Sequence, residues 1–313
     1  MNSIQTYKSI DGGKKQRRTR KIKKMNCNPI VEGKTVDKSS CMTPDVLTQL
    51  RTSYNKHHTN DSIKTKESKK IWKELKQKLS TCSKEDCWLD TVKDEKVKKE
   101  LLRHSFAPKH PDNWKKEPST WLTNYDILEV LKQYETAYST FEFIGPTPID
   151  FDSRPSDHNN ECVWKDLCAF ELKHFVAKKI TKIGVVFNLD KHNESGSHWT
   201  SLFIDLEEQL IFYMDSAGDT IPPEVNTLVV RIMKQGLEME NPLLFTFHEN
   251  APFEHQRGNN ECGMYSLYFI ITMLTGKSGR RKFKTIDDKI TYFKTERIPD
   301  TYVFKHRKKY FNS

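Results

Sequence analysis

Four side chains of this chain could together carry out nucleophilic chemistry at a carbonyl carbon. They occur in the order His198, Asp215, Gln256 and Cys262. A thiol becomes a strong nucleophile as a thiolate, and an imidazole held by a carboxylate can take the thiol proton. Cys262 would be the nucleophile, His198 its base, and Asp215 the carboxylate that orients the imidazole. The Gln256 amide and the backbone N–H of the nucleophile would stabilise the oxyanion that forms.

The tetrapeptide Asn-Asn-Glu-Cys occurs twice, so the nucleophile has two candidates. One copy ends at Cys162 and the other at Cys262. Cys162 precedes His198 in the chain and is followed by valine rather than glycine. Ser156 stands at the place where the other copy has Gln256. The roles and order of the set therefore favour Cys262, and we interpret Cys162 as chance repetition of a short polar sequence.

Apolar runs of strand length could bring the histidine and the aspartate together. Residues 182–189, 199–206 and 209–214 are rich in β-branched and aromatic side chains, and two glutamates separate the last two runs as in a hairpin. His198 would enter the first strand of this hairpin, and Asp215 would leave the second. Antiparallel pairing then predicts that both lie at the same end of a sheet.

Cys262 directly precedes an apolar run of helix length. Residues 263–274 are almost wholly apolar, and Thr275 and Gly276 follow. The nucleophile would therefore open a buried helix. The positive end of the helix dipole would favour a thiolate there.

The spacing of these residues has a counterpart in a known group of enzymes. His198-Trp199, an aspartate seventeen residues after the histidine, and Gln256-x5-Cys262-Gly263 resemble the SUMO-deconjugating branch of the ubiquitin-like-protein protease and adenain clan. The resemblance implies a cysteine protease with an α+β, papain-like core. In such a core a central mixed sheet carries the histidine and the aspartate, and a helix carries the nucleophile.

The same resemblance implies substrate-binding roles for three further residues. Residues 121–127 (WLTNYDI) look like the clan's Trp-Leu-x-Asp-x-x-Ile segment, whose tryptophan covers the channel for a Gly-Gly tail. Asn124 stands where the clan has its aspartate. Trp121, Trp199 and Gly263 are the residues expected to contact substrate. The alternative is that both tryptophans are only core aromatics.

Within the clan, the chain is similar to the SUMO-protease-like enzymes of large cytoplasmic DNA viruses, of African swine fever virus and mimivirus type. The segments 188–199 and 215–218 carry this similarity, with an added N-terminal region that holds residues 41–44 and 82–88. It implies cleavage after Gly-Gly in viral structural polyproteins during virion maturation. The expected location is the virion and the host cytoplasm, and no cofactor is expected.

Three other functions fit the same residues. A deconjugase for SUMO or ubiquitin-like proteins would cleave precursors that also carry Gly-Gly sites. An acyltransferase of the clan would use a similar histidine, acid and cysteine set to move an acyl group to a protein. A catalytically silent binding module would need none of the four residues intact.

Composition limits the class of protein. The 313 residues contain no apolar run near twenty residues and no signal-peptide pattern, which predicts a soluble chain that is not secreted and has no membrane partner. Seven cysteines at irregular spacing predict reduced thiols. Cys82-x4-Cys87 and Cys162-x5-Cys168 lack a well-spaced second pair, so no metal site is predicted.

The net charge of +10 is concentrated near the N-terminus. Residues 14–24 (KKQRRTRKIKK) hold eight of the 52 basic residues, which leaves 44 basic against 42 acidic side chains elsewhere. We expect a basic, disordered arm over residues 1–36 that could contact nucleic acid or a capsid component, although a plain solvated tail fits as well. Basic stretches at 277–284 and 305–309 raise the idea of stimulation by nucleic acid. Gly12-Gly13 could be a self-cleavage site, but a flexible glycine pair is the simpler interpretation.

The remaining chain divides into two expected parts. Apolar residues at helical spacing predict a helical accessory region over residues 37–110, which could hold substrate or serve only as padding. Three prolines close to residue 111 mark a linker into a catalytic core over 111–313. Within the core, residues 222–235 predict a helix and residues 243–247 predict a strand.

Overall fold

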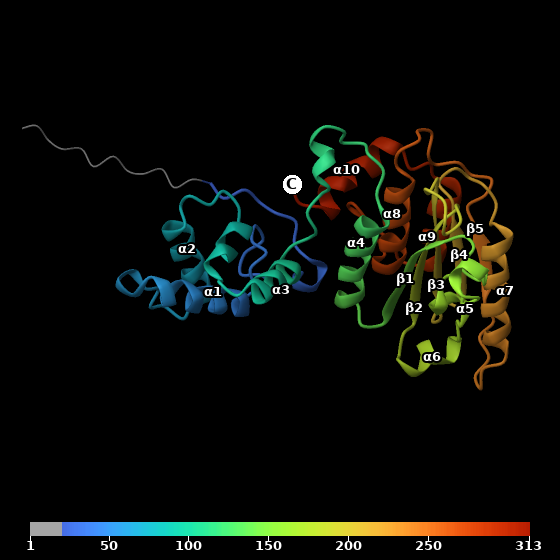
Figure 1. Cartoon of the computed structure of the whole chain (residues 1–313), viewed down its shortest axis with the longest axis horizontal. Helices are drawn as coiled ribbons and strands as arrows, with labels where there is room; N and C mark the ends of the chain where they lie inside the picture. The colour runs from blue at the N-terminus through green and yellow to red at the C-terminus, as the bar shows by residue number, and fades with distance from the viewer. Residues whose placement is uncertain (1–20) are drawn as a thin grey trace, which may run out of the picture.

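The computed structural model describes residues 21–313, with a helical part and a sheet-containing part side by side (Figure 1). Gly12-Gly13 and most of the basic run 14–24 lie outside the described residues. Among residues 21–313, no helix combines the length and apolar character that crossing a membrane requires.

A mixed five-stranded sheet forms the centre of the larger part. Its strand order is β1-β2-β3-β4-β5, with parallel pairing at the two outer positions and antiparallel pairing in between. The α+β core with a central mixed sheet is therefore confirmed. The strands span β1 Phe141–Pro148, β2 Lys182–Asn188, β3 Trp199–Asp205, β4 Leu210–Met214 and β5 Thr246–Glu249.

The register of β3 and β4 places both ends of the hairpin together, as expected. Ser201 lies opposite Met214 and Asp205 opposite Leu210. His198 immediately precedes β3 and Asp215 immediately follows β4, so the two side chains emerge at the same edge of the sheet. The predicted strand at 243–247 begins three residues later, as β5.

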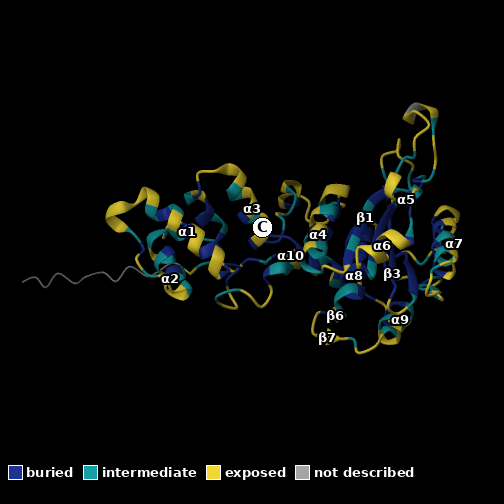
Figure 2. Cartoon of the chain, turned by 90° about the horizontal axis from the view of Figure 1, so that it is seen from below, coloured by how far each residue is buried: buried dark blue, intermediate teal, exposed yellow. Residues whose placement is uncertain are grey.

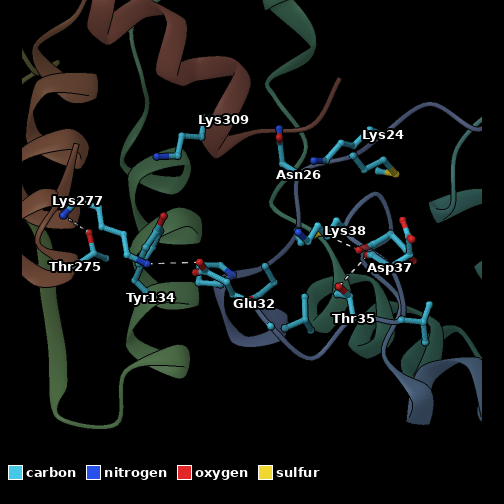
Figure 3. Close-up of a pocket in the computed structure, with 18 of the residues that line it drawn as sticks. Lys24, Asn26, Glu32, Thr35, Asp37, Lys38, Tyr134, Thr275, Lys277 and Lys309 are labelled. Atoms are coloured by element: carbon cyan, nitrogen blue, oxygen red, sulfur yellow. Dashed lines mark hydrogen bonds and ion pairs between the residues drawn. The ribbon is translucent and has the colours of Figure 1, made fainter. Parts of the chain in front are cut away.

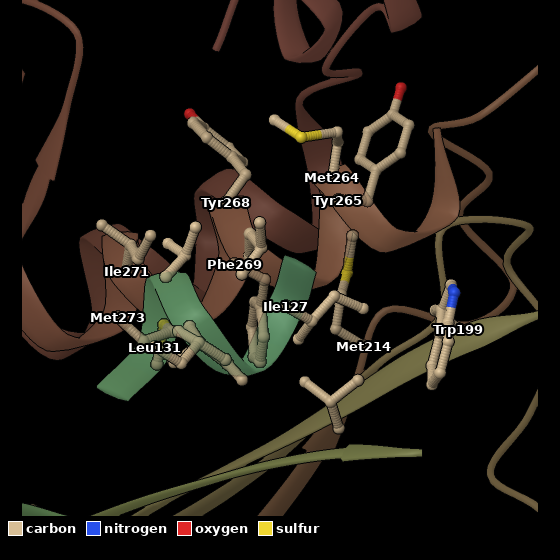
Figure 4. Packing of buried hydrophobic residues seen from close by; sticks show 14 of the residues in the cluster. Ile127, Leu131, Trp199, Met214, Met264, Tyr265, Tyr268, Phe269, Ile271 and Met273 are labelled. Atoms are coloured by element: carbon tan, nitrogen blue, oxygen red, sulfur yellow. The ribbon is translucent and has the colours of Figure 1, made fainter. Parts of the chain in front are cut away.

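Helices cover both faces of the sheet, which is why every residue of β3 and β4 is buried, with no alternation of buried and exposed positions. Phe203 and Phe212 pack toward α8 (Cys262–Thr275), whose apolar residues Figure 4 shows above the sheet. Leu202 and Tyr213, one residue away on the same strands, belong to the cluster on the opposite face, with α7 (Pro223–Leu237). This alternation follows from the two-residue period of a strand.

Both helices predicted for the catalytic part are present. The expected helices at 263–274 and 222–235 are α8 and α7. The C-terminal residue of α8 is followed by Gly276 at φ 64°, a left-handed cap that favours glycine. The other helices and strands of this part are α4 Asn124–Ala137, α5 Lys165–Cys168, α6 Leu172–Ala177, α9 Ile286–Thr295, α10 Asp300–Tyr310, β6 Lys277–Ser278, β7 Arg281–Lys282 and the 3-10 turns η4 Asp112–Lys115 and η5 Ser156–His158.

The N-terminal part has a hydrophobic cluster of its own, whose buried residues include Trp88 and Leu89. Figure 2 shows the buried segments of this part in dark blue. Two of its α-helices begin at side-chain caps, with Thr43 bonded to the N–H of Val46 and Asp94 to that of Lys96. A helical region is thus present where periodicity predicted one. The elements are η1 Pro29–Val31, α1 Pro44–His57, η2 Thr59–Asp61, α2 Ser68–Lys78, η3 Asp86–Thr91 and α3 Glu95–Ser105.

The expected disordered arm is wrong for residues 25–36. Met25 and Val31 are buried in or beside the N-terminal cluster, and Asn28 caps η1 and donates to the carbonyl of Arg103 at 2.6 Å. These residues are less charged than the basic run before them, and their apolar side chains find a core to pack on. The division of the chain at residues 36 and 110 stays a prediction.

The expectation of reduced thiols is wrong for six of the seven cysteines. The structure pairs Cys27 with Cys41, Cys82 with Cys87, and Cys162 with Cys168, at Cα–Cα distances of 5.1, 5.7 and 6.3 Å. Such distances suit a disulfide. Spacing in the sequence could not show these pairs, because the turns that bring each pair together are set by packing around them.

The two parts meet through polar contacts at the end of the chain. The Asn312 side chain accepts from the N–H of Asn26 at 2.8 Å and donates to the carbonyls of Asn26 and Ala107, both at 2.9 Å. A cavity of about 990 Å³ lies beside this seam, between the N-terminal part and helices α4 and α8 (Figure 3). Lys277 forms an ion pair with Glu32 across it, at 3.6 Å. None of the four residues expected to do chemistry lines this cavity.

Candidate active site

The end of the β3–β4 hairpin holds the histidine and the aspartate in contact. His198 Nε2 lies 2.7 Å from Asp215 Oδ1, and the aspartate is only 1% exposed. The side chain of His198 remains 22% exposed, so one face of the ring is reachable from solvent. Because the carboxylate binds Nε2, the other ring nitrogen, Nδ1, is left for a second partner.

Asp215 is itself held by backbone and side-chain bonds. Its Oδ1 also accepts from the N–H of Ala217 at 2.8 Å. The Asn250 side chain makes two hydrogen bonds to the Asp215 backbone: it accepts from the N–H at 2.9 Å and donates to the carbonyl at 2.7 Å. Asn250 lies thirty-five residues further along the chain, and no local motif pointed to it. It fixes the position from which the carboxylate orients the imidazole.

Cys262 begins α8, and its thiol lies close enough to His198 to affect the pKa of the imidazole. It is 1% exposed, and among the described cysteines it alone is free. Burial would lower the pKa of His198, but the hydrogen bonds to Asp215 and Cys262 and their charges outweigh it and raise that pKa to about 10. The geometry thus favours an imidazolium beside a sulfur at a helix N-terminus, the arrangement that activates a thiol.

Gln256 lies in the loop that leads from β5 to the nucleophile. Its backbone N–H donates to the Ser216 carbonyl at 2.8 Å, and its side-chain oxygen accepts from the Ser216 hydroxyl at 2.8 Å. Its Nε2 donates to the carbonyl of Gly258 at 2.6 Å. An amide nitrogen has two hydrogens, so this arrangement leaves the second one for another acceptor.

Trp121 and Trp199 line one cleft of about 680 Å³, which none of the four candidate catalytic side chains lines. Trp121 is 41% exposed and its Nε1 donates to Asn260 Oδ1 at 3.3 Å, two residues before the nucleophile. Trp199 is buried and donates to the Leu122 carbonyl at 3.1 Å. Loop residues on the other side of the cleft include His158, Trp164 and His192.

Gly263 is packed rather than open. A Cβ on this residue would lie 3.1 Å from Leu122 and 3.2 Å from Trp199. Leu122 follows Trp121 directly, so the absence of a side chain at position 263 lets both the Trp121 segment and Trp199 at the start of β3 approach the start of α8. Asn124, which differs from the clan's pattern, is the first residue of α4 and lines the same cleft.

The structure also separates the two copies of the tetrapeptide. Cys162 is bonded to Cys168 on a loop, whereas Cys262 contacts His198. Sequence reasoning missed several residues that hold the site, namely Ser216, Asn250, His255, Glu261, Asp300 and Arg307. Each acts through partners far away in the chain, so local spacing carried no signal for them. In the described range 21–313, no group of three histidine, cysteine or carboxylate side chains is arranged to hold a metal ion.

Comparisons with known proteins point to one family. Residues 173–307 match the Ulp1 protease family, C-terminal catalytic domain. The chain is 28% identical to a cysteine protease of African swine fever virus over 259 residues, or 77% of this chain and 88% of that protein. It is 24% identical over 264 residues, 77% of this chain and 82% of the relative, to a protein of Acanthamoeba polyphaga mimivirus that bears the name of a thiol protease.

A solved structure has the same fold. The crystal structure of an African swine fever virus protease aligns with 91% of this chain and 95% of its own length, with a TM-score of 0.60 at 22% identity. This likeness extends beyond the matched domain into the N-terminal helical part. The match over residues 173–307 and the names of the two viral relatives identify the chain as a cysteine protease related to the Ulp1 protease family.

Proposed function

We propose that this chain is an endopeptidase that cleaves after Gly-Gly in viral structural polyproteins during virion maturation, in the virion and the host cytoplasm. The observation that carries the catalytic part is the contact of His198 with both Asp215 and Cys262 at the start of α8. The names of the two viral relatives support the class of enzyme. The choice of polyproteins rests on similarity to proteases of large DNA viruses.

The cleft supports a substrate with small residues before the scissile bond. Trp121 and Trp199 line a cleft, and both Trp199 and Leu122 lie beside Gly263 in the first turn of α8. Large side chains next to the reacting carbonyl would collide with these rings. Two glycines would pass between them in extended form.

The reaction begins with Cys262 as thiolate and His198 as imidazolium. The sulfur forms a bond to the scissile carbonyl carbon, and the oxyanion is met by the free hydrogen of Gln256 Nε2 and by the backbone N–H of Cys262. His198 then gives its proton to the departing amine, and the C–N bond breaks to leave an acyl-enzyme. A water molecule, deprotonated by His198, attacks the thioester and releases the acid and the thiolate. Asp215 keeps the ring oriented in both halves.

The test is cleavage of Gly-Gly-Xaa peptides, a recombinant viral structural polyprotein, and SUMO and ubiquitin precursors by wild type and Cys262→Ala. We expect wild type to cleave the polyprotein and the peptides after Gly-Gly and the variant to cleave neither. Preference for intact ubiquitin-like precursors over polyprotein would replace the proposed substrate with a deconjugase role. Transfer of an acyl group from acetyl-CoA to a protein, without hydrolysis, would contradict the protease function.

A further inference from the structure

Helix α10 contacts both ends of the loop that carries the oxyanion donor and the nucleophile. Figure 1 shows α10 beside α8, and the two helices are in contact. Asp300 is the first residue of α10 and Arg307 lies seven residues later, two turns on, so both project from the same face. Asp300 reaches the beginning of the loop 256–262, and Arg307 reaches its end.

Asp300 holds the loop through two backbone N–H groups. Its Oδ2 accepts from Gly258 at 3.0 Å and from Arg257 at 3.1 Å. The carbonyl of Gly258 in turn accepts from Gln256 Nε2 at 2.6 Å. The other carboxylate oxygen accepts from the hydroxyl of Tyr265 on α8, at 2.7 Å. One carboxylate therefore connects the helix that bears the nucleophile to the peptide that holds the Gln256 amide.

Arg307 holds the other end of the loop. Its guanidinium makes two parallel bonds to the carboxylate of Glu261, at 3.0 and 3.1 Å, and both side chains are buried. It also donates to the carbonyl of Asn260 at 3.4 Å and to that of Thr120 at 2.7 Å. Burial raises the pKa of Glu261, and the bonds and charge of Arg307 oppose that shift.

The far side of the guanidinium is covered by an aromatic ring. The Arg307 guanidinium carbon lies 4.5 Å from the centre of the Trp114 ring. With its donors engaged and its face stacked, the side chain has little freedom to move. It therefore fixes the residue before Cys262 and the residue before Trp121 relative to each other.

We propose that α10 positions the catalytic loop, with Asp300 and Arg307 as its two positioning residues. Asp300 sets the direction of the Gln256 amide through Gly258. Arg307 sets the start of α8 and the distance between the nucleophile and the Trp121 segment. Neither residue touches the reacting atoms, and the inference rests on the protease function proposed above.

The test compares Asp300→Ala with Asp300→Asn in the full chain. Alanine removes the acceptor for Gly258, so kcat on a Gly-Gly peptide should fall about 30-fold, less than for outright loss of an oxyanion donor. KM should stay within about twofold, since the effect falls on the transition state. Asparagine keeps an oxygen for Gly258 and an N–H for the Tyr265 hydroxyl, so it should restore kcat to within about threefold of wild type.

Hydrogen–deuterium exchange provides a readout that does not need activity. Peptides covering residues 257–262 should exchange faster in Asp300→Ala than in wild type. In Asp300→Asn they should exchange at the wild-type rate. The double variant Arg307→Met with Glu261→Gln removes the buried charges together and so preserves folding. Residues 257–262 should also exchange faster in this double variant, and its kcat should fall while its KM changes little.

The outcomes separate the two claims. An inactive wild type whose loop still depends on Asp300 in the exchange measurement would sink the proposed function and leave the positioning role supported. An active wild type, with Asp300→Ala unchanged in kcat and in exchange, would overturn the positioning role alone. Equal losses in Asp300→Ala and Asp300→Asn would also overturn it, because they would assign the effect to charge rather than to the bonds.

Discussion

The two copies of Asn-Asn-Glu-Cys show how little of a catalytic site is contained in its local sequence. In residues 159–162 both asparagines have positive φ angles, of 54° and 57°, and the segment is a surface turn after η5. Its glutamate is exposed and its cysteine is bonded to Cys168. In residues 259–262 the glutamate is buried against an arginine and the cysteine begins a helix.

The difference comes from partners supplied by distant parts of the chain. Glu261 meets Arg307 from the C-terminal helix, and Cys262 meets His198 from the end of the hairpin. The turn at 159–162 has no histidine and carboxylate pair bonded to its cysteine. The cysteine of the first copy therefore closes a loop through a disulfide bond, whereas the cysteine of the second copy is the candidate nucleophile.

Replacing each of the two cysteines by serine in turn should give the largest difference in activity between the two copies. Cys262→Ser should lower kcat/KM for peptide cleavage by about 10⁴-fold or more, since a serine hydroxyl is a far weaker nucleophile beside the same imidazolium. Cys162→Ser should retain kcat. Steady-state cleavage of one Gly-Gly peptide by both variants measures this, and equal losses would remove the distinction between the copies.

Glu261 and Glu161, the glutamates of the two copies, should contribute differently to the free energy of unfolding. Arg307→Met leaves the Glu261 carboxylate buried without a partner, which should lower the free energy of unfolding by about 3–5 kcal/mol. Adding Glu261→Gln should recover part of that loss, whereas adding Glu161→Gln, the matched change in the exposed copy, should recover none. Urea denaturation measures all three variants, and equal recovery by the two glutamine changes would show that the buried pair is not special.

A buried histidine next to the catalytic loop should make its stability depend on pH. His255 accepts from the N–H of Ile298 at 3.2 Å and donates to the Phe293 carbonyl at 2.8 Å, so the folded protein holds it neutral. Burial lowers its pKa to about 4. Below pH 6.5 the unfolded chain binds the extra proton first, so stability should fall as pH decreases from 6.5 to 4, by roughly 3 kcal/mol.

The control for this prediction is His158, next to the first copy of the tetrapeptide. Denaturation curves at pH 7 and pH 4.5 for wild type, His255→Gln and His158→Gln would isolate the effect, because His158 is an exposed residue in the turn before Cys162. We expect the pH dependence to weaken only in His255→Gln. An unchanged pH dependence in that variant would show that other groups cause the acid destabilisation.

The smallest expected effect concerns the disulfide of the first copy. Cys162 and Cys168 are six residues apart, and closing so short a loop stabilises a fold by about 2 kcal/mol in the chain-entropy view. Cys162→Ser should lower stability by that amount. Thermal melting of Cys162→Ser and of Cys168→Ser would test it, and a difference between the two variants would point to contacts other than the bond.

Much of the fold followed from apolar patterns in the sequence. The hairpin strands and the helix after Cys262 are continuous apolar runs, and their order predicted where His198 and Asp215 would lie. Strand β1 was missed because Gly145, Pro146 and Pro148 interrupt it and because its partner β2 lies more than thirty residues away.

The supports of the site were harder to predict. Residues 305–309 suggested only a basic stretch that nucleic acid could contact, yet Arg307 within it is buried against Glu261, which lies 46 residues earlier in the chain. Asp300 and Asn250 bind backbone groups, which leave no pattern of residue types to detect. The sequence therefore predicted the pairing of His198 with Asp215, and only the tertiary structure identified the residues that hold the candidate site.

The most direct test of the central claim is iodoacetamide labelling of the unreduced wild-type protein between pH 6 and pH 10, mapped by mass spectrometry, with His198→Ala alongside. A thiol that can lose its proton to a neighbouring imidazole reacts faster with iodoacetamide than one without such a base. We predict that Cys262 is labelled in the wild type and that His198→Ala slows this labelling, most strongly at the low end of the pH range. Labelling at Cys162, or an unchanged rate in His198→Ala, would contradict the account.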